Sequence, residues 1–462
     1  LFSHRSDYDH AMRSLKTLHW PIRLPTLHRR LPLHMGIAAT FALAPVWYRL
    51  PGNADPFSAP YSAGFLIFWP MVWTVGWWLA LGLPGFAGLR RDPARRLWAL
   101  ALLLLALWAF LSAAWSYTGA FRPEVTVGAA LPLGVAALFA VAAACVGSPR
   151  QIVIVLCAGL VWNAALAGLQ VALQGPAGLR ALGEFAIHPQ QSGVSVVLAD
   201  GVRWLRPYGL LPHPNILAGF LAVGLLAALG LAFSPGRLAQ RAGGGLLLAG
   251  LWALLLTFSR AAWLGLAAGL IAILPLLWRR RPLRWQIPAA LLGGASLAAA
   301  GLFAALYWPF LANRAGVGDD ASLELRSISD RAIFADFARQ AITETPLIGA
   351  GIGNFPWKAS QYLRSTPYDL RGQPVHQVYL SAWAELGLVG LGLLAVALGA
   401  GVEATLQAWR GSRRPERALL LGGAIALAVI GLFDHYPWTL LQFQALWWGL
   451  LAAAGCPVSA PE

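Results

Sequence analysis

Apolar runs of about twenty residues, bounded by arginine, proline or glycine, recur along the whole chain. A helix needs about 20 mostly apolar residues to cross the roughly 30 Å hydrocarbon core of a bilayer. The run at 243–258 and the one at 260–278 could also form one long helix broken at Arg260. The pattern predicts an all-α polytopic membrane protein with about 12 transmembrane helices. The twelve segments lie approximately at 33–50, 61–82, 97–115, 124–147, 151–173, 214–233, 243–258, 260–278, 286–308, 377–401, 418–436 and 438–456.

The composition agrees with this pattern. Apolar residues make up 58% of the 462 residues and charged residues 11%, against roughly 45–50% and about 25% in soluble domains. The 22 Trp, 20 Phe and 10 Tyr exclude a disordered chain, and only three Cys exclude a disulfide-stapled one.

Basic residues divide unequally between the two sides of the predicted membrane. With the N-terminus inside, 21 of the 34 Lys and Arg fall in inner segments, together with six of the 19 acidic residues. The inner side then carries the whole formal net charge of +15, as the positive-inside rule expects. This distribution predicts a cytoplasmic segment at 1–32, and it removes the main argument for a nucleic-acid partner.

Two outer segments are long, and long ordered loops are usually functional. The first, at 174–213, interrupts the helices predicted within 33–308. It contains Asp200-Gly201 between two β-prone runs, which predicts a hairpin ending near Arg206. The second, at 309–376, precedes the last three helices within 377–456.

The second segment predicts an amphipathic helix from Ser322 to Ile342. Pro346 ends the helical pattern, and the glycines at 349, 351 and 353 predict a tight turn. The expected apolar face comprises Leu325, Ile328, Ala332, Ile333, Phe337 and Ala341, and the polar face Arg326, Asp330, Arg331 and Arg339.

Arg206, Arg260 and Arg326 lie at the outer ends of predicted helices. An arginine at the rim of a membrane bundle is costly unless it is paired, and its planar fork binds phosphate in a bidentate manner. The alternative role is contact with lipid headgroups.

His376 lies where a polar loop meets a predicted helix and is followed by Tyr379 and Glu385. That is a suitable place for a general base facing a wet cavity. His435, which follows Asp434 in another outer loop, is the competing candidate. No His/Cys cluster has metal-ligand spacing, so no metal site is predicted.

Several segments, taken in order, resemble motifs of the O-antigen ligase and polymerase superfamily. One departure is Gln377, where many relatives have Asn. The segments are Arg206-Pro207-Tyr208-Gly209 with His213-Pro214-Asn215, then Thr257 to Trp263, Glu324 to Ser327, Pro346 to Phe355, and Val375 to Leu380 with Glu385-Leu386-Gly387.

The resemblance implies a C-type, metal-independent, inverting glycosyltransferase on the periplasmic side of the bacterial inner membrane. Such an enzyme transfers O-antigen polysaccharide from undecaprenyl diphosphate to the lipid A core oligosaccharide in lipopolysaccharide biosynthesis. It implies that Arg206, Arg260 and Arg326 bind the diphosphate and that His376 is the catalytic base. Asn215, Tyr379 and Glu385 are then supporting residues, and no cofactor is needed because the leaving group is already activated.

Other functions remain open at this point. Within the superfamily the acceptor could be another growing glycan, as in a polymerase, or a protein serine, as in an oligosaccharyltransferase. The three helices predicted after His376 leave no room for the extra outer domain common in the protein-modifying branch, which favours the ligase. A twelve-helix transporter is the alternative from another class, but seven of the predicted helices lack ionisable residues in their central turns.

Overall fold

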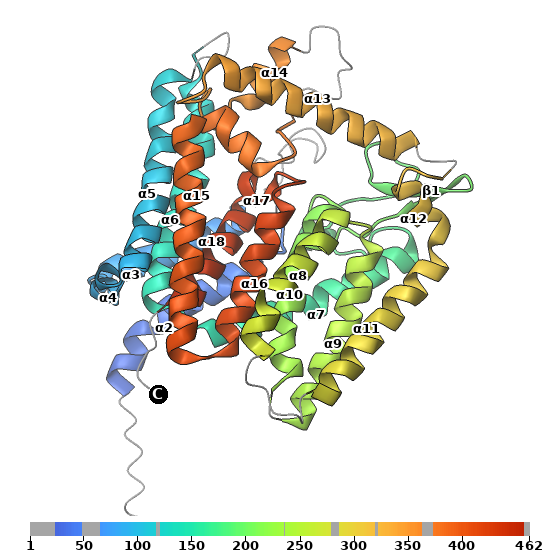
Figure 1. Ribbon diagram of the computed structural model, residues 1–462, viewed down its shortest axis with the longest axis horizontal. Coiled ribbons are helices and arrows are strands. Elements are labelled where there is room, and N and C mark those ends of the chain that lie inside the picture. Colours follow the sequence, from blue (N-terminus) through green and yellow to red (C-terminus); the bar gives the residue numbers. More distant parts are fainter. Residues whose placement is uncertain are drawn as a thin grey trace, which may run out of the picture.

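The computed structural model describes residues 24–48, 65–116, 121–234, 236–278, 286–318, 322–362 and 373–456. Helices dominate these residues, with a single two-stranded sheet (Figure 1). The α-helices are α2 (Leu24–Leu43), α3 (Phe65–Ala80), α4 (Phe86–Arg91), α5 (Pro93–Leu111), α6 (Pro123–Val146), α7 (Pro149–Leu173), α8 (Pro214–Ala232), α9 (Arg237–Leu256), α10 (Arg260–Trp278), α11 (Gln286–Leu306), α12 (Trp308–Arg314), α13 (Ser322–Glu344), α14 (Phe355–Tyr362), α15 (Val378–Ser412), α16 (Pro415–Ile430), α17 (Tyr436–Thr439) and α18 (Leu441–Gly455).

Eight helices in the described part of the chain, α5 to α11 and α15, are long and apolar enough to cross a membrane. The protein is therefore a multi-pass membrane protein. Each of the twelve predicted segments overlaps a helix. Besides the eight helices above, the helices that match predicted segments are α2, α3, α16 and α18. Helices α16 and α18 have only 16 and 15 residues. Every residue of α18 is buried, so its apolar sequence reflects a place inside the helix bundle.

Proline fixes where many of these helices begin. Its missing N–H costs nothing in the first turn, and its φ angle already suits a helix. The proline therefore separates each helix from the loop before it. Five helices of 16 or more residues have proline as their first residue: Pro93, Pro123, Pro149, Pro214 and Pro415.

The apolar stretch at 243–278 forms two helices. Helix α9 ends at Leu256 and α10 begins at Arg260. Between them Phe258 adopts a positive φ of 50°, and its ring packs against Phe303 with centroids 5.3 Å apart. The break places Arg260 at a helix start and leaves the Thr257 carbonyl available to a side chain.

The predicted hairpin is confirmed. Strands β1 (Val196–Ala199) and β2 (Val202–Leu205) are antiparallel, with Val196 opposite Leu205. Asp200 and Gly201 have φ angles of 52° and 72°, which a two-residue turn with the twist of a hairpin requires. The hairpin brings Arg206 back toward the end of the bundle.

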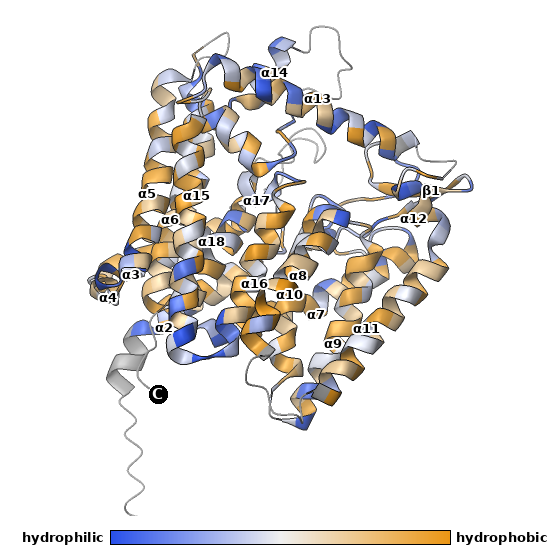
Figure 2. Cartoon of the chain, in the orientation of Figure 1, coloured by the Kyte–Doolittle hydropathy of each residue, from blue (hydrophilic) through white to orange (hydrophobic). Residues whose placement is uncertain are grey.

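Helix α13 lies across the end of the bundle that also carries the hairpin and α12 (Figure 1). Hydrophilic residues are frequent along α13, whereas the helices beneath it are mostly apolar (Figure 2). The basic turn between α15 and α16, with Arg413 and Arg414, lies at the opposite end (Figures 1 and 2). This arrangement gives the molecule one end that holds the long loop and one that is basic.

The helix predicted from Ser322 is confirmed, but its expected apolar face is wrong in part. Leu325 and Ile328 are 56% and 47% exposed, whereas Phe334 and Ala338 are fully buried. Helical period alone gives the direction of an apolar stripe, but the shape of the neighbouring elements decides which part of it is covered.

The glycine-rich turn after α13 packs against a kink in α15 at Gly387, whose φ is 68°. A Cβ at Gly387 would lie 2.2 Å from the Leu347 carbonyl carbon, so only glycine fits. The amide of Ala350 donates to the Ala384 carbonyl at 3.0 Å, and that of Gly351 to the Glu385 carbonyl at 2.8 Å. These amides therefore hold the loop to α15.

Candidate functional site

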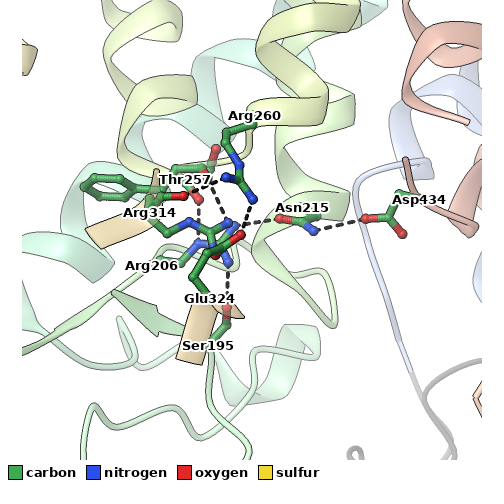
Figure 3. Close-up of polar contacts among 9 residues, drawn as sticks. Ser195, Arg206, Asn215, Thr257, Arg260, Arg314, Glu324 and Asp434 are labelled. Atoms are coloured by element: carbon green, nitrogen blue, oxygen red, sulfur yellow. Dashed lines mark hydrogen bonds and ion pairs between the residues drawn. The ribbon is translucent and has the colours of Figure 1, made fainter. Parts of the chain in front are cut away.

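Arg206 follows strand β2 and has only 3% of its surface exposed. Its Nε donates to the Thr257 carbonyl at 2.6 Å, its Nη1 to Ser195 Oγ at 2.7 Å and its Nη2 to Asn215 Oδ1 at 2.6 Å (Figure 3). All three acceptors are neutral. Burial lowers the pKa of the Arg206 guanidinium, because the cation has lost its hydration. A cation buried among neutral partners gains more from an anionic ligand than an exposed one.

Arg260 and Arg314 adjoin this residue and share one carboxylate. Both form ion pairs with Glu324, and Arg260 Nη1 also donates to the Arg314 carbonyl at 2.6 Å (Figure 3). Glu324 comes from α13 and is 4% exposed. Burial lowers the pKa of Arg314 to about 10, which leaves it protonated at neutral pH. The pairing ties α13 to the start of α10 through Arg260 and to the end of α12 through Arg314.

A cavity of about 210 Å³ opens beside Arg206. Three arginines and one carboxylate line it, so its wall carries a net positive charge. Its polar lining consists of Ser195, Arg206, His213, Asn215, Asn313, Arg314, Glu324, Ser327 and Arg331. A compact cavity of this charge suits an anionic group with several oxygen acceptors.

One face of α13 continues from this cavity toward His376. Glu324, Ser327 and Arg331 line the cavity, and Phe334, one further turn along, lies with its ring 6.2 Å from that of His376. These positions are spaced by three or four residues, as one helix face requires. Arg326 lies on another face, is exposed, and does not line the cavity.

The two competing histidines are neighbours. The His376 and His435 rings meet edge to face with centroids 5.0 Å apart. His435 is 4% exposed, and its Nδ1 lies 2.8 Å from Thr439 Oγ1. The side chain of His376, in contrast, is only partly buried. Of the two rings, His376 is therefore the more open to a substrate.

Burial is the largest cause that lowers the pKa of each histidine near the cavity. It brings the pKa values of His213 and His435 to about 3 and lowers that of His376 below its ordinary value. The positive charge of Arg331 adds to all three shifts. These imidazoles are therefore neutral at pH 7, and a neutral imidazole can accept a proton.

The other expected residues have different surroundings. Asn215 connects Arg206 to Asp434, because its Nδ2 donates to Asp434 Oδ2 at 3.0 Å (Figure 3). The Tyr379 hydroxyl donates to the Ala428 carbonyl at 2.8 Å, so it joins α15 to α16. Glu385 is buried and accepts the Phe355 amide at 3.4 Å. Neither Tyr379 nor Glu385 lines the cavity.

Sequence reasoning missed Arg314, Arg331 and Asp434 as members of this site. Arg331 shares the spacing of Glu324 and Ser327 along α13, and that spacing is the signal that could have found it. The described residues contain no group of three or more His, Cys, Asp or Glu that could hold a metal ion.

The fold and the site define a helical membrane protein with a positively charged cavity at one end. Residues 245–395, about a third of the chain, match the family model described as O-antigen ligase. This domain is shared by O-antigen ligases, polymerases and oligosaccharyltransferases, which are membrane glycosyltransferases that use polyprenyl-linked glycan donors. The match includes α10 to α14 and His376 but not Arg206 or Asp434. No curated protein compared with the chain gave a significant match.

Proposed function

We propose that this protein is an inverting, metal-independent O-antigen ligase of the bacterial inner membrane. It transfers O-antigen polysaccharide from undecaprenyl diphosphate to the lipid A core oligosaccharide on the periplasmic side, without a cofactor. The observation that carries the proposal is the buried, neutrally partnered Arg206 beside Arg260 and Arg314 in a chain that carries the matched domain.

The arginines would act on the leaving group. As the acceptor oxygen bonds to the anomeric carbon, the bond from that carbon to the diphosphate oxygen breaks and negative charge grows on the diphosphate. Guanidinium groups fixed in advance stabilise that charge without reorganising. Arg206 and Arg260, with Arg314 and Arg331 nearby, supply this environment.

An apolar cavity of about 450 Å³ supports a lipid donor. It lies between α8, α9, α10 and α11, and α10 contributes Leu266, Leu270 and Leu277 to its wall. At a rise of 1.5 Å per residue these positions run from about 9 to about 25 Å along α10 from Arg260. One helix thus presents arginine at its start and an apolar wall below, as a diphosphate on a polyprenyl chain requires.

His376 would take the proton from the acceptor hydroxyl as the new bond forms. Direct attack by the acceptor inverts the configuration at the anomeric carbon. The position of His376 next to the face of α13 that lines the cavity supports this role.

The direct test uses the purified full-length protein with a polyprenyl-diphosphate glycan and lipid A core, without added metal. The joined product should appear as a shifted band on a gel. Longer glycans formed without lipid A core would identify a polymerase, and glycosylated pilin-like protein an oligosaccharyltransferase. Donor transport across proteoliposomes without any joined product would favour the transporter.

The proposed topology has twelve spans with both termini in the cytoplasm. Single cysteines placed near positions 185, 340 and 370 should react with an impermeant reagent added from outside. Cysteines near positions 93, 281 and 413 should react only after the membrane is opened. Protection of the 309–376 segment from the outside reagent would contradict both the topology and the proposed mechanism.

Replacing either Arg331 or Arg326 with alanine tests which of these two arginines of α13 binds the diphosphate. The resemblance assigns Arg326 to the diphosphate, whereas the cavity is lined by Arg331. We expect Arg331→Ala to lower kcat/KM for the donor by about tenfold or more, and Arg326→Ala to have the smaller effect. The reverse order, measured on equal amounts of folded protein, would support the assignment from the resemblance.

A further inference from the structure

Asp434 lies in the turn between α16 and α17 and faces two groups of residues. It is 6% exposed. Its Oδ2 accepts the Asn215 side-chain amide at 3.0 Å, and its Oδ1 accepts the His435 backbone amide at 2.9 Å. Oδ1 also lies 4.0 Å from His435 Nε2. One buried carboxylate therefore contacts the residue that holds Arg206 and the residue that packs on His376.

On the arginine side, Asp434 and Arg206 together fix the orientation of the Asn215 amide. A carboxylate only accepts hydrogen bonds and a guanidinium only donates them. The amide between them must present its nitrogen to Asp434 and its oxygen to Arg206, as Figure 3 shows. An uncharged amide at position 434 could both donate and accept, so Arg206 alone would then fix this orientation.

On the histidine side, the carboxylate of Asp434 interacts electrostatically with the imidazoles of His213, His376 and His435. The charged and titratable groups around these rings and Asp434 include Arg331 on α13, Arg206 and Tyr208 after β2, Tyr436 at the start of α17, and the histidines themselves at 213, 376 and 435. Burial raises the pKa of Asp434, but His435, His376 and Arg331 bring it below its ordinary value. Asp434 is therefore ionised at neutral pH.

We propose that Asp434 is a positioning residue that couples the arginine cluster to the histidine pair. Through Asn215 it orients the Arg206 guanidinium toward the leaving group, and its charge faces the imidazolium that forms during the reaction. When the acceptor oxygen bonds to the anomeric carbon, the electron pair of the broken bond goes to the diphosphate and the acceptor proton goes to His376. Asp434 thus supports both ends of one step, and this role rests on the proposed function.

The test compares three variants of the full-length protein in glycan transfer between about pH 4 and about pH 8. Asp434→Asn should lower kcat by about 10²-fold, as a displaced catalytic group does. It should also move the acid limb of the pH profile about one unit lower, because loss of a neighbouring negative charge makes the imidazolium easier to deprotonate. Asn215→Ala, which keeps the charge of Asp434, should lower kcat, because Arg206 is no longer held toward the leaving group, and should leave the acid midpoint in place.

Asp434→Glu keeps the negative charge and replaces Asp434→Asn in the test if the Asp434→Asn protein does not fold. It should lower kcat but keep the wild-type midpoint, and a shifted midpoint in this variant would overturn the inference. An Asp434→Asn enzyme with the wild-type rate, or with an unmoved midpoint, would overturn it as well while the proposed function stands. A wild-type protein without transferase activity would overturn the proposed function together with this inference.

Discussion

Replacing His376 with alanine is expected to slow glycan transfer by about 10²- to 10⁴-fold, the usual cost of losing a general base. His376 is the more exposed ring of the pair and lies beside the α13 face that lines the cavity. The arginines that we propose as donor ligands remain in the variant, so binding of the lipid diphosphate should persist. Single-turnover transfer and donor binding, measured on the same preparation, separate the two effects.

His435→Ala is the matched control, because its ring lies next to that of His376 but is more deeply buried. We expect it to keep appreciable activity. Full activity in His376→Ala together with loss in His435→Ala would transfer the role of base to His435. Activity in both variants would mean that substrate position and leaving-group stabilisation suffice without a histidine base.

The assignment of His376 as general base also determines how the rate of glycan transfer depends on pH. From its sequence alone His376 is expected to titrate near the unperturbed value of about 6.5. Burial lowers its pKa in the structure, and the active form of a base is the neutral one. Activity should therefore persist at pH 6.5 and fall only at lower pH, as His376 becomes protonated. A rate that increases on acidification would contradict a histidine base.

Arg206→Ala is expected to lower transfer by about 10²- to 10³-fold, as the loss of a fixed donor to a developing anion does. The residue is buried, and its guanidinium donates hydrogen bonds to three neutral acceptors rather than to a carboxylate. Arg206→Lys should recover little, because an ammonium group cannot reproduce the planar fork. Initial rates at saturating donor give kcat, and a titration with inorganic pyrophosphate measures the loss of anion binding.

Arg339→Ala is the control for charge alone. Arg339 is also on α13 and also an arginine, but it is 68% exposed and pairs with Asp336 on the same helix. Its replacement should leave transfer near the wild-type rate. If Arg206→Ala were no worse than Arg339→Ala, contact with lipid headgroups would be the better account of these arginines.

The sequence by itself determined the elements that depend on neighbours along the chain. Apolar runs and helix-starting prolines gave helices at all twelve predicted segments, and Asp200-Gly201 gave the hairpin. These signals are local, because hydrogen bonds within a helix or across a tight turn join residues close in sequence. Arg206 and Arg260 were also recognisable, because a charge at the border of an apolar run is conspicuous.

Only the tertiary structure decided which charges meet. Arg206 contacts Thr257, 51 residues later, and Asn215 contacts Asp434 across 219 residues. No local pattern connects such positions, so Asp434 could not be joined to the arginines from the sequence. The spacing of apolar residues likewise predicted that α13 is a helix, but it did not predict which face of that helix is buried. Packing at the end of the bundle turned Glu324 and Arg331 toward the cavity and left Arg326 exposed, because which face a helix buries is decided by the surface beneath it.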